Sequence, residues 1–113
     1  MDINGFLGEL LREISRLDFV VGIDFHIEVI TIKGRVLLRK ESYFVEIYYN
    51  EVTGTMAFAL IENNKRLWGV DYDNIRKWHE HPLENPLTHK SISEKSISEI
   101  IKELQKIYLR LQD

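Results

Sequence analysis

The segment YFVEIYYNEVTGTMAFALIENNKRLWGV (residues 43–70) decides the fold of this chain. Within residues 43–49 large side chains recur at every second position, which is the period of a β-strand with one face in the core. Thr53-Gly54 and Asn63-Asn64 are turn sequences, and they divide the segment into strands over residues 43–49, 56–61 and 66–70. Connections this short require antiparallel neighbours, because a parallel crossover needs about a dozen residues.

Upstream of this segment the sequence predicts two more strands and a helix. Apolar residues alternate with polar ones over residues 21–29, and Gly34 is expected to permit a tight reversal into a strand at 36–38. Before them, apolar residues recur at spacings of three and four, the pattern of an amphipathic helix that Asp2 or Asn4 would cap. The residues of this stripe are Leu7, Leu10, Leu11, Ile14 and Leu17.

The end of the chain restores a helical pattern. Ser96 and Glu99 have the spacing of a capping box, with Ser93 as a competing cap. The predicted fold is therefore a single α+β domain over residues 1–113, with an N-terminal helix, a five-stranded antiparallel meander, an irregular loop and a C-terminal helix, both helices packing on the sheet. The apolar stripe of the last helix consists of Ile97, Ile100, Ile101, Leu104, Ile107, Tyr108 and Leu111.

Composition excludes several classes of function. The 113 residues contain no cysteine, so disulfides, thiolate metal sites and thiol catalysis are excluded. A net charge of −3 without long runs of one sign argues against non-specific binding of duplex DNA. No apolar run is long enough to span a bilayer, and the N-terminal residues lack the basic and apolar regions of a secretory signal. We expect a cytoplasmic protein.

The periodicity stops between Asp71 and Ser91, and both prolines of the chain, Pro82 and Pro86, fall in this interval. A loop of about twenty residues without regular structure is unusual in a compact domain, and indicates either function or disorder. Trp78 and the prolines favour order. The segment DYDNIRKWHEHPLENPLTHK (71–90) is therefore the predicted functional loop.

Three of the four histidines lie in this loop. His79 and His81 are one residue apart, so in an extended backbone their side chains point to the same side. His89 can return to the same place after the proline-containing excursion, and Asp71 and Asp73 share one parity at the end of the preceding strand. The simplest alternative is that the histidines are independent, solvent-exposed loop residues.

If the histidines converge, two kinds of chemistry follow. One is metal-free acid–base catalysis, which suits cleavage of RNA through its own 2′-hydroxyl and needs only a base, an acid and a cation on the phosphate. The other is a divalent metal site of nitrogen and oxygen ligands, although the familiar zinc-binding spacings are absent. We predict the first, without a cofactor. The catalytic candidates are His79, His81, His89 and Asp73, and the substrate-binding candidates are Asn74, Arg76, Lys77, Trp78 and Lys90, with Trp78 or Tyr72 stacking a base.

Three blocks carry a resemblance to a known family: VEIYYNEVTGTMAFALI (45–61), KRLWGVDYDN (65–74) and WHEHPLENPLTHK (78–90). They resemble short archaeal proteins that look related to the TumE family, the toxin components of type II toxin–antitoxin pairs. The resemblance implies RNA cleavage or another block on translation, and an antitoxin partner that covers the loop. The residues it carries over are Asp73, Asn74, Trp78, His79, His81, Pro82 and His89.

Two alternatives remain open beside a ribonuclease-type toxin. One is a non-enzymatic module whose loop docks a protein partner, with Trp78 as the anchor. The other is a metal-dependent hydrolase or metal sensor. A homodimer is a further expectation, since an exposed edge of the sheet is prone to pairing unless it is covered.

Overall fold

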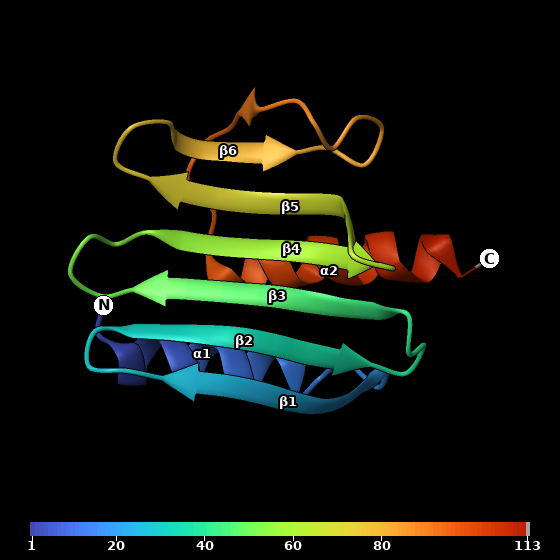
Figure 1. Cartoon of the computed structure of the whole chain (residues 1–113), viewed down its shortest axis with the longest axis horizontal. Helices are drawn as coiled ribbons and strands as arrows, with labels where there is room; N and C mark the ends of the chain where they lie inside the picture. Colours follow the sequence, from blue (N-terminus) through green and yellow to red (C-terminus); the bar gives the residue numbers. More distant parts are fainter. Residues whose placement is uncertain (113) are drawn as a thin grey trace.

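Seven antiparallel strands follow one another in chain order across a single sheet, from β1 at one edge to β7 at the other (Figure 1). The computed structural model describes residues 1–112. The α+β class and the antiparallel meander are confirmed, but the predicted number of five strands is wrong. The strands are β1 (Val20–Ile27), β2 (Thr31–Leu38), β3 (Tyr43–Asn50), β4 (Met56–Glu62), β5 (Lys65–Asp73), β6 (Lys77–His81) and β7 (Lys90–Ser91).

The additional strands lie where an irregular loop was predicted. β5 runs on to Asp73, turns at residues 74–76, and pairs with β6, so the longest irregular stretch of the predicted loop is residues 82–89. Side chains alternate between the two faces of β6, as in any strand. On one face, however, the alternate positions are occupied by His79 and His81 instead of apolar residues. Polar side chains buried on a strand therefore concealed β6 from pattern analysis.

Gly34 does not form the predicted reversal. It lies inside β2, opposite Phe25 of β1, and the chain reverses at residues 28–30 instead. Gly34 has a φ of 154°, and a Cβ there would lie 2.1 Å from the carbonyl oxygen of Asp24. A glycine is required because the β1 backbone approaches too closely for any side chain.

Both helices cover the same face of the sheet (Figure 1). In α1 (Ile3–Ile14), the Asp2 side chain accepts a hydrogen bond from the Gly5 N–H at 2.8 Å. In α2 (Ile97–Leu111), Ser96 and Glu99 form the predicted capping box, with reciprocal bonds of 3.1 and 3.0 Å. These caps satisfy N–H groups that have no partner within the first turn of a helix. In residues 1–112, neither helix has the length and apolar composition of a membrane span.

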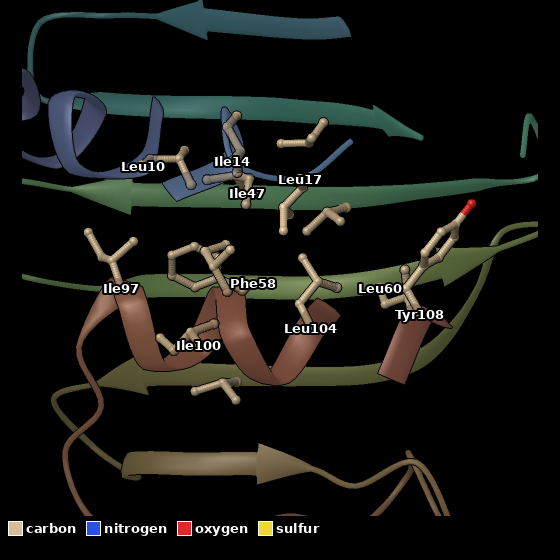
Figure 2. Packing of buried hydrophobic residues seen from close by; sticks show 14 of the residues in the cluster. Leu10, Ile14, Leu17, Ile47, Phe58, Leu60, Ile97, Ile100, Leu104 and Tyr108 are labelled. Carbon is tan, nitrogen blue, oxygen red and sulfur yellow. The ribbon is translucent and has the colours of Figure 1, made fainter. Parts of the chain in front are cut away.

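The core lies between the helices and this face of the sheet (Figure 2). The Phe6 ring of α1 stacks on Tyr49 of β3 with centroids 4.4 Å apart, and Phe19 stacks on Tyr108 of α2 at the same separation. Each large side chain buried in this way contributes roughly 2 kcal/mol to stability. Side chains exposed by less than 2% include Phe6, Leu10, Ile47, Phe58, Leu60, Trp68, Ile100 and Leu104.

Candidate functional site

His79 and His81 project from β6 on the face of the sheet opposite the helices. Glu80, between them, accepts a hydrogen bond from the Trp68 indole N–H at 2.9 Å, and Trp68 belongs to the core under α2. Because side chains alternate along a strand, the two histidines point the other way. Each is nevertheless only 4% exposed, so something other than a helix covers them.

The cover is the segment of residues 82–89. It folds back through two turns, and the Pro86 carbonyl oxygen lies 3.0 Å from Nδ1 of His81. The ring of His89, at the end of the segment, lies 4.5 Å from the His81 ring and 5.4 Å from the His79 ring, measured between centroids. The three histidines therefore converge, as the sequence predicted, with His89 on the exposed side.

One carboxylate joins the two buried histidines. Oδ2 of Asp71 lies 3.1 Å from Nε2 of His81 and 3.4 Å from Nε2 of His79. Asp71 stands directly opposite His79 in the register of β5 with β6. We call Asp71, His79, His81 and His89 the histidine cluster.

The structure places Asp73, the carboxylate predicted to be catalytic, at the end of β5, where the chain turns towards β6. Its Oδ1 accepts hydrogen bonds from the backbone N–H groups of Arg76 (2.7 Å) and Ile75 (2.9 Å). These two bonds stabilise the carboxylate and hold the pKa of Asp73 below its usual value. Asp73 shapes the hairpin, and Asp71 occupies the centre of the cluster. Asp71 and Asp73 lie two residues apart, so the sequence alone does not show which of them reaches the histidines. The register of the hairpin shows that it is Asp71.

Backbone carbonyl groups orient both buried imidazoles. Nδ1 of His79 lies 3.0 Å from the Lys77 oxygen, just as Nδ1 of His81 lies 3.0 Å from the Pro86 oxygen. A carbonyl oxygen can only accept, so each Nδ1 carries a hydrogen and donates it. Both Nε2 atoms therefore face Asp71, where each either donates a proton to the carboxylate or presents a lone pair.

Two arginines flank the cluster. Nη1 of Arg66 lies 3.1 Å from Nε2 of His81, and Nη1 of Arg76 lies 3.1 Å from Nδ1 of His89. Two guanidinium groups against the single carboxylate of Asp71 give the cluster an excess of positive charge, which suits a phosphate group. Arg76 was predicted. Arg66 was not, because nothing in the sequence relates it to His81 before the strand register is known.

His89 has a pKa below the usual value of a histidine. Desolvation is the largest cause, followed by the positive charge of Arg76 and the neighbouring imidazoles, while Asp71 acts in the opposite direction. The lowered pKa favours the neutral form of His89. A neutral, exposed imidazole can accept a proton from a bound molecule.

The remaining predicted substrate-binding residues lie outside the cluster. Trp78 and Lys90 are on the helix-covered face: Trp78 packs beside Tyr72, with ring centroids 5.3 Å apart, and Lys90 lines a groove next to α2. Lys77 is exposed at the start of β6 with a φ of 59°. Asn74 donates to the Thr53 carbonyl oxygen at 3.3 Å and thereby ties this turn to the next hairpin.

The cluster also has the donor set of a metal site. One nitrogen from each of His79, His81 and His89 lies within 4.8 Å of the others. In tetrahedral zinc sites with ligand bonds of 2.0–2.1 Å, the ligand atoms are about 3.3 Å apart. The distances from Asp71 Oδ2 to the two Nε2 atoms, 3.1 and 3.4 Å, are close to that value. Imidazoles whose Nδ1 donates to a carbonyl are also the usual form of histidine ligands.

No protein-family model, curated protein or solved structure matches this chain. The resemblance to the TumE family therefore stays a prediction, and the function is inferred from the geometry of the cluster.

Proposed function

We propose that this chain is a metal-independent enzyme that cleaves RNA by acid–base catalysis at the histidine cluster. The main support for the proposal is that one site contains imidazoles in different environments. His89 is exposed and its pKa is lowered, whereas His79 and His81 are buried with both Nε2 atoms facing the Asp71 carboxylate. A base and an acid in different environments, with cations beside them, are what transfer of a phosphodiester to a neighbouring hydroxyl requires.

His89 acts as the base. Its imidazole removes the proton from a ribose 2′-hydroxyl, and the 2′-oxygen attacks the adjacent phosphorus. Arg66 and Arg76 neutralise the charge that builds on the non-bridging oxygens, since their guanidinium groups already lie 3.1 Å from cluster nitrogens.

His79 acts as the acid. The bond from phosphorus to the 5′-oxygen breaks, and that oxygen takes the proton from Nε2 of His79, which Asp71 holds in place. We assign this role to His79 because Arg66 approaches Nε2 of His81 and opposes a proton there. The products are a 2′,3′-cyclic phosphate and a 5′-hydroxyl, and no protein nucleophile is consumed.

The biological setting that fits such an enzyme is a toxin of a type II toxin–antitoxin pair, as the resemblance to the TumE family implies. A free ribonuclease with an exposed base is harmful to its cell unless a partner covers it. Residues 82–89 and the adjoining turn form the surface that an antitoxin would occupy. Induced expression of the chain should then arrest growth with fragmentation of RNA, and a His79→Ala/His81→Ala variant should not.

The direct test uses purified protein and an RNA oligonucleotide, with and without EDTA. His79→Gln and His89→Gln should each reduce the cleavage rate by roughly a hundredfold or more. The matched control is His26→Gln, which changes the fourth histidine, exposed in β1. Equal cleavage by the cluster variants and by the wild-type chain would exclude the cluster as the site of catalysis.

A second candidate function, metal-dependent hydrolysis, is favoured by the convergence of three imidazoles with Asp71 Oδ2, which lies 3.1 and 3.4 Å from two of their nitrogens. The same assay separates it from the first. A metal-dependent enzyme loses activity in EDTA, regains it on addition of Zn²⁺, and does not need the 2′-hydroxyl.

A further inference from the structure

β1 forms a free edge of the sheet, at the opposite side from the histidine cluster (Figure 1). Exposed edges normally carry lysine, proline or inward-pointing charges, which discourage pairing with another chain. The eight residues of β1, VVGIDFHI, contain neither lysine nor proline. A β-bulge between Val20 and Gly22 interrupts one end of the strand, but the regular part from Ile23 to Ile27 lacks these protections.

The side chains of β1 that face the helix side are apolar and largely uncovered. Ile23 lies opposite Val36, a core residue of β2, yet it is 46% exposed. Ile27, in the same row and opposite the core residue Ile32, is 54% exposed. An apolar row of this length beside the core points to a partner that completes it.

The row is symmetric about Phe25. Its regular part reads Ile23, Phe25, Ile27, so reversing its direction leaves it unchanged. If a second copy pairs antiparallel with Phe25 opposite Phe25, then isoleucine meets isoleucine on both sides of the central pair. Matched apolar pairs across strands are the main source of stability between paired strands.

The other face of β1 has complementary charges in the same register. Asp24 then stands opposite His26 of the second copy, and symmetry makes this contact twice. A shift that sets Asp24 opposite Asp24 brings like charges together, and a shift that sets Ile23 opposite Ile23 places Asp24 against Gly22. Only the register centred on Phe25 satisfies both faces of the strand.

The backbone of β1 is free to bond in this register. The Glu28 N–H donates to the Thr31 oxygen of β2 at 2.8 Å. Since N–H groups alternate in direction along an antiparallel strand, those of Ile23, Phe25 and Ile27 point away from β2. They are the groups that a pairing centred on Phe25 would use.

We propose that two copies of this chain form a symmetric dimer through antiparallel pairing of their β1 strands. The two sheets become continuous, the exposed apolar rows of both copies meet, and the two histidine clusters remain at the outer ends. The proposal does not depend on the chemistry of the cluster, because β1 and β6 lie at opposite sides of the sheet.

The mass in solution gives the first test. Sedimentation equilibrium of the full chain should give twice the monomer mass of 13.4 kDa. An Ile23→Lys/Ile27→Lys variant should be monomeric and still folded by circular dichroism. Leu109→Lys, which alters a 49% exposed leucine of α2, is the matched control and should remain dimeric. A monomeric wild-type chain, or a dimer that survives both lysines in β1, would overturn the proposal.

Cross-linking tests the register independently. The chain has no cysteine, so Phe25→Cys introduces a single thiol whose Cα lies about 5.5 Å from its symmetry mate, within the range of a disulfide. The control Ile23→Cys places the two thiols about 13 Å apart along the strands. Oxidation should therefore link Phe25→Cys into dimers and leave Ile23→Cys unlinked. Linkage of Ile23→Cys in preference to Phe25→Cys would contradict the register.

Discussion

Asp71 and His79 face each other across the hairpin of β5 and β6, with the carboxylate oxygen 3.4 Å from Nε2. The same oxygen lies 3.1 Å from Nε2 of His81. One aspartate thus contacts two imidazoles, and the cluster depends on it more than on any other carboxylate. Several expectations follow from this arrangement and from its surroundings.

Asp71→Asn should lower the cleavage rate by roughly a hundredfold, because an amide neither stabilises a charged imidazole nor holds its proton toward the substrate. Asp73→Asn is the comparison. It should leave the rate of the folded enzyme close to wild type and lower stability by about 1 kcal/mol, since it weakens the hydrogen bonds of the turn. Rate measurements together with urea unfolding separate the two effects. If Asp73→Asn lost more of the cleavage rate than Asp71→Asn, then Asp73 would be the catalytic carboxylate.

The acidic limb of the pH–rate profile should have its midpoint below 6.5. His89 must be deprotonated to act as a base, and its pKa is lowered by desolvation and by Arg76, so activity appears as pH rises through that lowered value. Arg76→Ala removes a positive neighbour and should move the midpoint to higher pH. Lys77→Ala, which changes the next residue at the start of β6, should not. An unchanged midpoint in Arg76→Ala would mean that a different group is the base.

Gly34→Ala should destabilise the chain by about 1–3 kcal/mol or prevent folding, because the added Cβ would meet the Asp24 carbonyl oxygen at 2.1 Å in a backbone conformation that side chains disfavour. The control is Gly8→Ala in α1, where nothing lies within 4 Å of the added carbon. That change should stabilise the helix by about 0.5–1 kcal/mol. Thermal unfolding of both variants checks the pair, and a tolerated alanine at position 34 would show that β1 can move away from β2.

Trp78→Ala should reduce stability by roughly 2 kcal/mol and leave the cleavage rate of the folded fraction nearly unchanged. Its indole packs against the core and Tyr72 on the helix-covered face, away from the cluster. Urea unfolding gives the loss of stability. The cleavage rate is measured at a temperature where the variant is folded. A selective rise in KM would instead support the predicted stacking of a base on Trp78.

The order of elements could be predicted from the sequence because apolar alternation, turn residues and capping residues act locally. Asp2 and the Ser96–Glu99 box cap their helices as expected. β6 could not be predicted from the sequence, because histidines replace apolar residues on one of its faces. Gly34 was misread because a glycine serves a close approach of two strands as readily as a turn.

The convergence of the three histidines was predictable from their parity and from the length of the intervening segment. The partners of those histidines were not. Asp71 and Arg66 reach the cluster through the pairing of β5 with β6, and that register is a property of the folded hairpin. Trp78 and Lys90 were expected at the site because they are close in sequence, yet strand alternation sends them to the opposite face.

The most direct test of the central claim is cleavage of a DNA oligonucleotide that contains one ribonucleotide, in the presence of EDTA. The 2′-hydroxyl is then available at a single position. We expect the wild-type chain to cut after that nucleotide and leave a 2′,3′-cyclic phosphate, and His89→Gln to be slower by roughly a hundredfold or more. Absence of cleavage by the folded wild-type chain, or equal cleavage of an all-deoxy oligonucleotide, would contradict it.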